Sequence, residues 1–196
     1  TARDVSHNYG TPGSYQVKLV VTTNNGCKDS SSTTVNIFES PVAGFTANTA
    51  SQCFSNNQFS FTNTSSISAG SLQYTWDFGD GSFATATDVT HNYTAPGVYT
   101  VRLIALSDKN CSNEITTVIT VHPNPEADFN LNSAAAQCFK NNSFNFKNIT
   151  TITGGNLHYT WDMGNGDTFA SSAVTYSYHL PGTNTVKEKA TSGKHG

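Results

Sequence analysis

The 196-residue sequence predicts an all-β protein built from small sandwiches. The clearest strand is the segment 74–78, in which Tyr74, Trp76 and Phe78 alternate with polar residues. This period-2 pattern is typical of a strand that buries one face. Similar short segments, separated by turns rich in glycine, proline and asparagine, recur along the chain without helical periodicity. About seven such strands per repeat favour two packed sheets.

Internal repetition divides the chain into three segments. The sequence YTWDFGDG at 74–81 returns as YTWDMGNG at 159–166, and HNY at 7–9 returns at 91–93. A period of this length is close to the size of one small sandwich. We therefore expect the C-terminal part of a first repeat, a complete second repeat, and a third repeat that lacks its last strand, at residues 1–39, 40–123 and 124–196 respectively.

The alternation of apolar residues also predicts which side chains form the cores. In the first repeat, we expect Tyr15, Val17, Leu19 and Val21 to point inward along one strand, before a final strand over 33–38. Strands of the second repeat are expected near 42–47, 59–61, 74–78, 84–87, 89–93, 99–105 and 115–121. Its predicted core consists of Phe45, Phe59, Phe61, Trp76, Tyr93, Tyr99, Val101, Leu103, Ile119 and Val121.

The third repeat departs from this pattern in the segment Asn184–Ala190. Asn184 and Glu188 stand where the second repeat has Tyr99 and Leu103, so both are expected to point into the core. An unpaired carboxylate in a core is destabilising. A degenerate or frayed strand is therefore expected there.

Composition and motifs exclude several function classes. Only 12% of the residues are charged, the net charge is −3, and no basic stripe exists, so nucleic acid and anionic membrane are poor partners. No run of about 18 apolar residues that could span a membrane occurs. Nucleophile, metalloprotease and phosphate-loop motifs are missing from the sequence as well. Because Thr1 begins within a repeat, any targeting segment is expected upstream.

The polar residues of the main motif are interpreted as structural. Trp76 is predicted to anchor the core, and Asp77, Gly79, Asp80 and Gly81 to fix the strand end and its turn. Trp161 and Asp162 repeat these roles in the third repeat. Asp80 becomes Asn165 and His91 becomes Tyr176, exchanges that a catalytic base would not tolerate. The sequence therefore predicts no enzyme.

The ordered motifs over residues 74–103 resemble the PKD (polycystic kidney disease) domain family. The resemblance rests on YTWDFGDG, then His91-Asn92-Tyr93, Pro96-Gly97 and the strand from Tyr99. It implies tandem immunoglobulin-like β-sandwiches in an extracellular, secreted or cell-surface protein. We expect a structural or adhesive segment of a long surface or filament protein, whose partners are other modules of the array, neighbouring copies, or surface polysaccharide or protein. The alternative is an accessory polymer-binding module of a secreted hydrolase.

No cofactor is expected; the histidines lack the spacing of a zinc site, and calcium is the metal candidate. Asp77, Asp80 and Asp88 could supply oxygen ligands, and some relatives of the family bind calcium near module junctions. A calcium site wants six to eight oxygens, however, so turn formation is the favoured role of these residues. Three segments also match the glycosylation sequon, at Asn63, Asn92 and Asn148.

Four cysteines are candidates for disulfide bonds in an extracellular setting. Cys27 and Cys111 precede the final strand of their repeats, whereas Cys53 and Cys138 follow the first strand. A Cys53–Cys111 bridge within the second repeat is one arrangement. The other joins the first loop of one module to the last hairpin of the following module, because the two positions within one module are expected at opposite ends.

Overall fold

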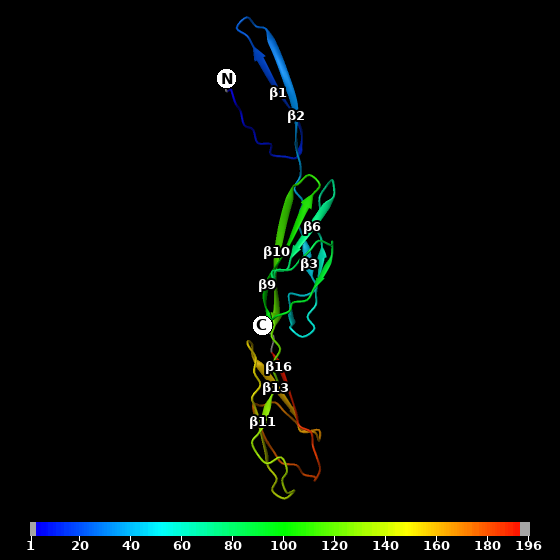
Figure 1. Ribbon diagram of the computed structural model, residues 1–196, viewed down its shortest axis with the longest axis vertical. Helices are drawn as coiled ribbons and strands as arrows, with labels where there is room; N and C mark the ends of the chain where they lie inside the picture. The colour runs from blue at the N-terminus through cyan, green and yellow to red at the C-terminus, as the bar shows by residue number, and fades with distance from the viewer. Residues whose placement is uncertain (1–2, 193–196) are drawn as a thin grey trace. The chain divides into compact units, whose positions relative to one another are not determined.

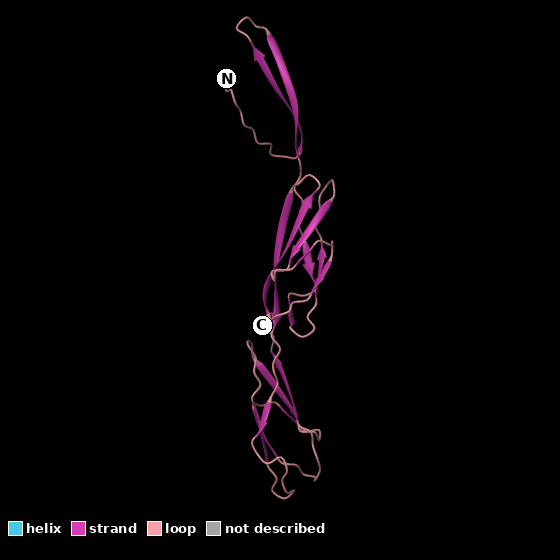
Figure 2. Ribbon diagram, in the orientation of Figure 1, coloured by secondary structure: helices cyan, strands magenta, loops and turns pink. Residues whose placement is uncertain are grey.

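The computed structural model describes residues 3–192, and all of the regular elements there are strands (Figures 1 and 2). The predicted all-β class is therefore confirmed. Contacts divide the chain into two compact units, with a boundary that runs through the second repeat. The strands are β1 Gly13–Thr22, β2 Lys28–Ile37, β3 Phe45–Ala47, β4 Ser51–Cys53, β5 Phe59–Asn63, β6 Leu72–Asp77, β7 Phe83–Ala84, β8 Val89–His91, β9 Gly97–Ser107, β10 Ser112–His122, β11 Phe129–Leu131, β12 Phe144–Asn148, β13 Leu157–Asp162, β14 Thr168–Phe169, β15 Ala173–Tyr176 and β16 Lys187–Ser192.

The first repeat is a two-stranded antiparallel hairpin of β1 and β2, paired from Gly13 and Ile37 to Thr22 and Lys28. Tyr15, Val17, Leu19 and Val21 were expected to be buried; Tyr15 is half-buried, and the prediction is wrong for the other three. Val17, Leu19 and Val21 are 42%, 65% and 54% exposed, because no second sheet covers them within the described residues. Alternation marks a face that can be buried, but the covering sheet must come from other strands.

The second repeat contains a three-stranded sheet, β3-β5-β8, and a five-stranded sheet, β4-β10-β9-β6-β7. Most of its strands were predicted, with ends displaced by a few residues. The strand β4 was not predicted; it pairs in parallel with β10 from Ser51 opposite Thr120 to Cys53 opposite His122. This strand has three residues and no alternation, so its conformation depends on the edge that β10 offers.

Eight of the ten predicted core residues of this repeat are buried, and only Phe45 and Tyr99 are half-buried. Ala105 is also buried but was not predicted, and Phe78, which lies on the apolar face predicted for the strand 74–78, is buried as well. Phe78 follows the last residue of β6 yet keeps the parity of Trp76, and its ring lies 5.9 Å from that of Phe61. The apolar face therefore continues one residue beyond the strand.

Aromatic rings pack in nearly the same way in the second and third repeats. The Phe45 ring meets Trp76 edge-on at 5.0 Å, and the Phe129 ring meets Trp161 edge-on at 5.1 Å. Phe61 lies 5.8 Å from Trp76. Such edge-on contacts stabilise a core beyond the area that they bury. Each tryptophan is fully buried, as predicted for an anchor.

The third repeat contains two three-stranded sheets, β11-β12-β15 and β14-β13-β16. Its core cluster comprises Phe146, Trp161, Met163, Val174 and Tyr176. Within the described residues, no strand corresponds to β4 or β10 of the second repeat. As expected from the sequence, β16 carries a polar residue at a core position, since Glu188 pairs directly opposite Trp161.

Replacing the anchor of the second repeat is predicted to be strongly destabilising. Trp76→Ala should lower the free energy of unfolding by about 3–5 kcal/mol, because it leaves a large cavity beside Phe45 and Phe61. Urea denaturation followed by circular dichroism measures this change. Phe83→Ala, at a position that is 64% exposed, is the control and should change stability little. Equal effects of the two substitutions would contradict the anchor role.

Candidate functional site

Each tryptophan is also held by a hydrogen bond from its indole nitrogen. Trp76 Nε1 donates to the carbonyl oxygen of Ala86 at 3.0 Å, and Trp161 Nε1 donates to that of Ser171 at 2.8 Å. In both repeats the acceptor lies ten residues further along the chain. A buried indole N–H needs such a partner, so the loop that follows the motif is fixed to the anchor.

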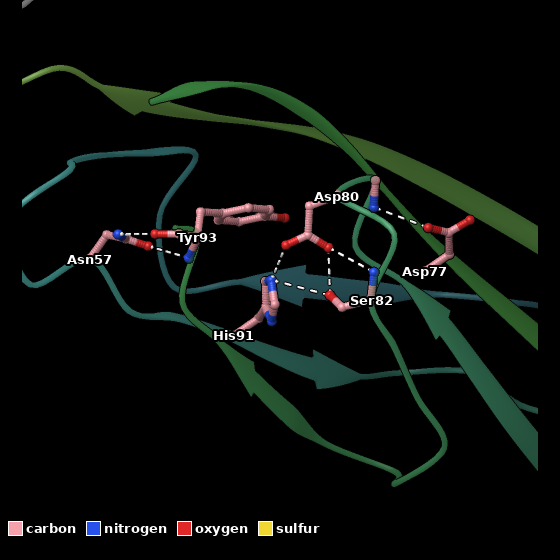
Figure 3. Close-up of polar contacts among 7 residues, drawn as sticks. Asn57, Asp77, Asp80, Ser82, His91 and Tyr93 are labelled. Atoms are coloured by element: carbon pink, nitrogen blue, oxygen red, sulfur yellow. Dashed lines mark hydrogen bonds and ion pairs between the residues drawn. The ribbon is translucent and has the colours of Figure 1, made fainter. Parts of the chain in front are cut away.

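The strand end after each tryptophan is closed by an aspartate and a glycine. Asp77 Oδ1 accepts a hydrogen bond from the Gly79 amide at 3.0 Å (Figure 3). Gly79 has a φ of 79°, and a Cβ there would lie 2.7 Å from the carbonyl oxygen of Thr100. Only glycine fits both the angle and the close approach. Asp162 and Gly164 form the same turn, with a hydrogen bond of 2.8 Å.

Asp80 is the centre of a polar network in the turn of the second repeat (Figure 3). Its Oδ1 accepts hydrogen bonds from the amide and the hydroxyl of Ser82, at 3.0 and 2.5 Å. Its Oδ2 lies 2.7 Å from Nε2 of His91, whose ring stacks on Phe78 at 4.1 Å. Burial alone would raise the pKa of Asp80, but the hydrogen bonds from Ser82 and His91 lower it below its ordinary value.

The third repeat builds an equivalent network from different residues. Asn165 replaces Asp80, and its Nδ2 donates to the hydroxyl of Tyr176 at 2.7 Å. Tyr176 replaces His91, and its hydroxyl donates to Asp167. The carboxylate has therefore moved two positions along the turn, and a phenol has replaced an imidazole. Both versions join the turn to the neighbouring strand, β8 or β15, which is a structural use of these groups.

A buried asparagine forms a second polar contact that the sequence did not reveal. Asn57 is 4% exposed; its Nδ2 donates to the carbonyl oxygen of Tyr93 at 2.9 Å, and its Oδ1 accepts from the amide of Tyr93 at 2.8 Å (Figure 3). Asn142 makes the same pair of bonds with Tyr178, at 2.9 and 2.7 Å. In the sequence, this asparagine recurs four residues after Cys53 and again four residues after Cys138, and that repetition could have indicated its role.

The three calcium candidates are engaged by donors of the protein. Asp77 also lies 3.1 Å from Arg102, and Asp88 accepts a hydrogen bond from the Asn63 amide at 2.8 Å. Across residues 3–192, no three His, Cys, Asp or Glu side chains gather closely enough to hold a metal ion. Asp77 and Asp80 make the turn contacts that the sequence analysis favours over calcium binding.

The expectation of disulfide bonds is wrong for this structure, in which all four cysteines are free thiols. Cys53 pairs opposite His122, the last residue of β10, whereas Cys111 directly precedes Ser112, the first residue of that strand. A strand of this length spans roughly 35 Å, far more than the ~7 Å that a disulfide allows. The bridge within one repeat is thus excluded by topology, whereas bridges to modules outside this chain stay a prediction.

Two of the three sequon asparagines turn their amides inward. The Nδ2 atoms of Asn63 and Asn148 are buried, and their Oδ1 atoms accept hydrogen bonds from the amides of Ser65 and Thr150 at 2.7 and 2.6 Å. These asparagines therefore serve as local turn formers. Asn92, in contrast, is exposed.

Glu188 is held in a poorly matched environment next to Trp161. Its Oε1 accepts a hydrogen bond from the Thr150 hydroxyl at 3.3 Å, whereas its Oε2 is buried without a partner. Burial raises the pKa of Glu188, the nearby charge of Asp128 raises it further, and the hydrogen bond from Thr150 opposes the shift. The folded state therefore disfavours the ionised carboxylate.

These features define the second and third repeats as immunoglobulin-like β-sandwich modules built around a tryptophan. None of the described residues form a helix long and apolar enough to cross a membrane. Two family models, both described as PKD domain, match the chain. One matches residues 1–37 and again 38–121, and the other matches residues 128–194. The chain therefore belongs to the PKD domain family and is a tandem array of PKD domains, as predicted.

Several known proteins are similar to parts of this array. Collagenase ColA of Bacillus cereus is 33% identical over 69 residues, which are 35% of this chain and 7% of the collagenase. The PKD1 domain of Vibrio anguillarum Epp is 32% identical with a TM-score of 0.39, covering 43% of this chain and 96% of that domain. The PKD1 domain of the Vibrio cholerae metalloprotease PrtV is 34% identical with a TM-score of 0.38, covering 42% and 98%.

The Asp80 network predicts an acid dependence of stability. A carboxyl whose pKa is lower in the folded chain stabilises the fold above its ordinary value of 3.8, and this contribution is lost as the pH falls through the folded pKa. Asp80→Asn should remove the part of the acid-induced loss of stability that comes from protonation of Asp80. Urea midpoints measured from neutral pH to below 3.8 test this, with Asn165→Ala in the third repeat as a control that leaves the Asp80 contribution unchanged. Identical acid profiles for the wild type and Asp80→Asn would contradict it.

Glu188→Leu is predicted to stabilise the third repeat. The substitution removes a carboxylate that has an unpaired buried oxygen and supplies leucine, the residue type that faces Trp76 in the second repeat. Because Glu188 is half-exposed, we expect the free energy of unfolding to rise by only roughly 1 kcal/mol. A raised pKa means that stability is lost as the pH rises from 4.5 through the folded pKa. The gain should therefore be larger at neutral pH than below 4.5. Urea denaturation at both pH values measures it, and a destabilised variant would contradict it.

Proposed function

We propose that this chain is a non-catalytic structural segment of a long extracellular surface or filament protein. The observation that supports the proposal most is that the motif residues are buried or hydrogen-bonded within their own repeat. Trp76 and Trp161 are fully buried, and Asp80 is occupied by Ser82 and His91. The polar network of the turn is built from different residues in the two repeats. Such exchanges are compatible with a role in the fold but not with a role in a reaction.

The proposed setting and partners follow from this role. An extracellular location is supported by relatives among collagenases and metalloproteases. The partners we propose are other modules of the same array and neighbouring copies of the chain, with surface polysaccharide or protein as a further class. Neither nucleic acid, a membrane span nor a cofactor is part of the proposal.

An accessory module of a secreted hydrolase is the second candidate, and the same relatives favour it. Collagenase ColA and the metalloprotease PrtV carry similar segments. Polymer binding of this kind needs two or three coplanar aromatic rings on one sheet face. In the second repeat the rings of Phe59, Phe61 and Trp76 are buried, and Phe83 on β7 is the large aromatic side chain that is clearly exposed. This distribution favours the structural role for the second repeat; Phe38, Phe139 and Phe169 are exposed elsewhere in the chain.

Co-sedimentation of the full chain with insoluble collagen and with chitin separates the two roles. A structural segment should show no saturable binding to either polymer. Phe83→Ala is the informative variant because it removes an exposed ring without touching the core. Saturable binding that Phe83→Ala weakens would overturn the structural role and support the accessory module.

A further inference from the structure

Three segments of the chain match the sequon for N-linked glycans, and two of them are used by the fold. Asn63 ends β5 and Asn148 ends β12, so the two hold equivalent positions in the second and third repeats. In both, the Nδ2 atom is buried, and Oδ1 accepts a hydrogen bond from the amide two residues later. Because a glycan would be attached to this buried nitrogen, neither asparagine can carry one in the folded chain.

The hydroxyl groups of these two sequons are engaged as well. Ser65 Oγ accepts a hydrogen bond from the Gly44 amide at 3.1 Å and donates to the Gly44 carbonyl oxygen at 3.3 Å. Thr150 Oγ1 accepts a hydrogen bond from the Asp128 amide at 3.2 Å and donates to the Asp128 carbonyl oxygen at 3.4 Å. Each hydroxyl thus holds the residue that precedes β3 or β11, and the fold alone explains why both sequons are present.

The remaining sequon, Asn92-Tyr93-Thr94, presents its two outer side chains to solvent. It follows His91, the last residue of β8, and both Asn92 and Thr94 are exposed. Within residues 3–192, neither of these two side chains forms a hydrogen bond. Tyr93 between them is 2% exposed, and its amide and carbonyl groups are bonded to Asn57 at 2.8 and 2.9 Å (Figure 3). The buried tyrosine therefore fixes the segment with the acceptor nitrogen and the hydroxyl on the outside.

Comparison of the repeats indicates that the fold needs the tyrosine of this segment but not the sequon. The sequence NYT at 92–94 corresponds to NYG at 8–10 and to SYH at 177–179. All three segments keep the tyrosine, whereas only the second repeat has a sequon at this place. Asn63 and Asn148, in contrast, recur as turn formers. Packing and turn formation therefore do not account for the pairing of Asn92 with a threonine two residues later.

We propose that Asn92 is the acceptor of an N-linked oligosaccharide, an inference that uses the extracellular setting proposed above. Nδ2 of Asn92 forms a bond to the anomeric carbon of the sugar, while the bond from that carbon to a lipid-linked pyrophosphate breaks. The lipid pyrophosphate leaves, and a base of the transferase takes the proton from Nδ2. The glycan would stand at the end of β8, which has β5 on one side and no strand on the other within the described residues. A bulky group there hinders pairing of this edge with another chain.

Secretion of the full chain by cultured eukaryotic cells, followed by intact mass spectrometry, tests the assignment. We expect a species that is heavier than the 21.0 kDa polypeptide by one oligosaccharide. Peptide N-glycosidase should remove this mass and convert the modified asparagine to aspartate, and peptide mapping should place the conversion at position 92. A chain secreted without a glycan would overturn the proposal, and so would a glycan at Asn63 or Asn148.

A matched pair of substitutions separates glycosylation from effects on the fold. Thr94→Ser keeps the sequon and should keep the glycan, whereas Thr94→Ala should abolish it, and a glycan that persists in Thr94→Ala contradicts the assignment. Because Thr94 is exposed, both variants, when produced without glycan in bacteria, should unfold at the wild-type urea midpoint. Thr150→Ala removes a structural hydroxyl, so it should lower the urea midpoint and leave the glycan in place. Failure of these tests would not affect the structural role, which polymer binding decides separately.

Discussion

The second and third repeats each depend on a buried tryptophan that is held both by ring contacts and by a hydrogen bond. The apolar rings of Trp76 contact Phe45 and Phe61, while the indole nitrogen donates to the carbonyl oxygen of Ala86. The first contact holds the anchor in the core, and the second ties the loop after the strand to the same side chain. A smaller apolar residue would supply neither the ring contacts nor the donor. The third repeat preserves both through Trp161, although many neighbouring residues have changed.

The turn that follows each tryptophan requires its glycine, but its polar residues can be exchanged. Gly79 and Gly164 are required by their positive φ and by a close carbonyl oxygen. The polar network is defined by its bonds and tolerates different residues, since Asp80 and His91 in one repeat correspond to Asn165 and Tyr176 in the other. The loss of the Asp80 carboxylate as an acceptor is tolerated because Asp167, at the position of Ser82, supplies another acceptor. Comparison of the two repeats therefore shows that the backbone geometry of the turn fixes the glycine, whereas hydrogen bonding requires only that donors and acceptors match.

Sequence patterns predicted the strands that bury one face and the anchors, because alternation and large aromatic residues report directly on a core. They could not predict β4, which has three residues and takes its conformation from the edge of β10. They also missed Asn57, because an asparagine in a loop is normally exposed and its contact with Tyr93 lies 36 residues away. For Leu19 and Val21 they identified a face suited to burial, whereas the structure leaves it exposed. Alternation carries no information about whether a covering sheet is present.

The same reasoning explains why β16 differs from β9 although both pair with a tryptophan-bearing strand. A strand in the middle of a sheet is stabilised from two edges, so its core residues are selected strongly. β16 has one neighbouring strand, β13, within the described residues, and Glu188 itself is half-exposed. Contact with solvent lessens the penalty for a polar side chain, and Thr150 satisfies one oxygen of Glu188. Partial exposure and one hydrogen bond thus make Glu188 tolerable opposite Trp161, although its second oxygen is buried without a partner.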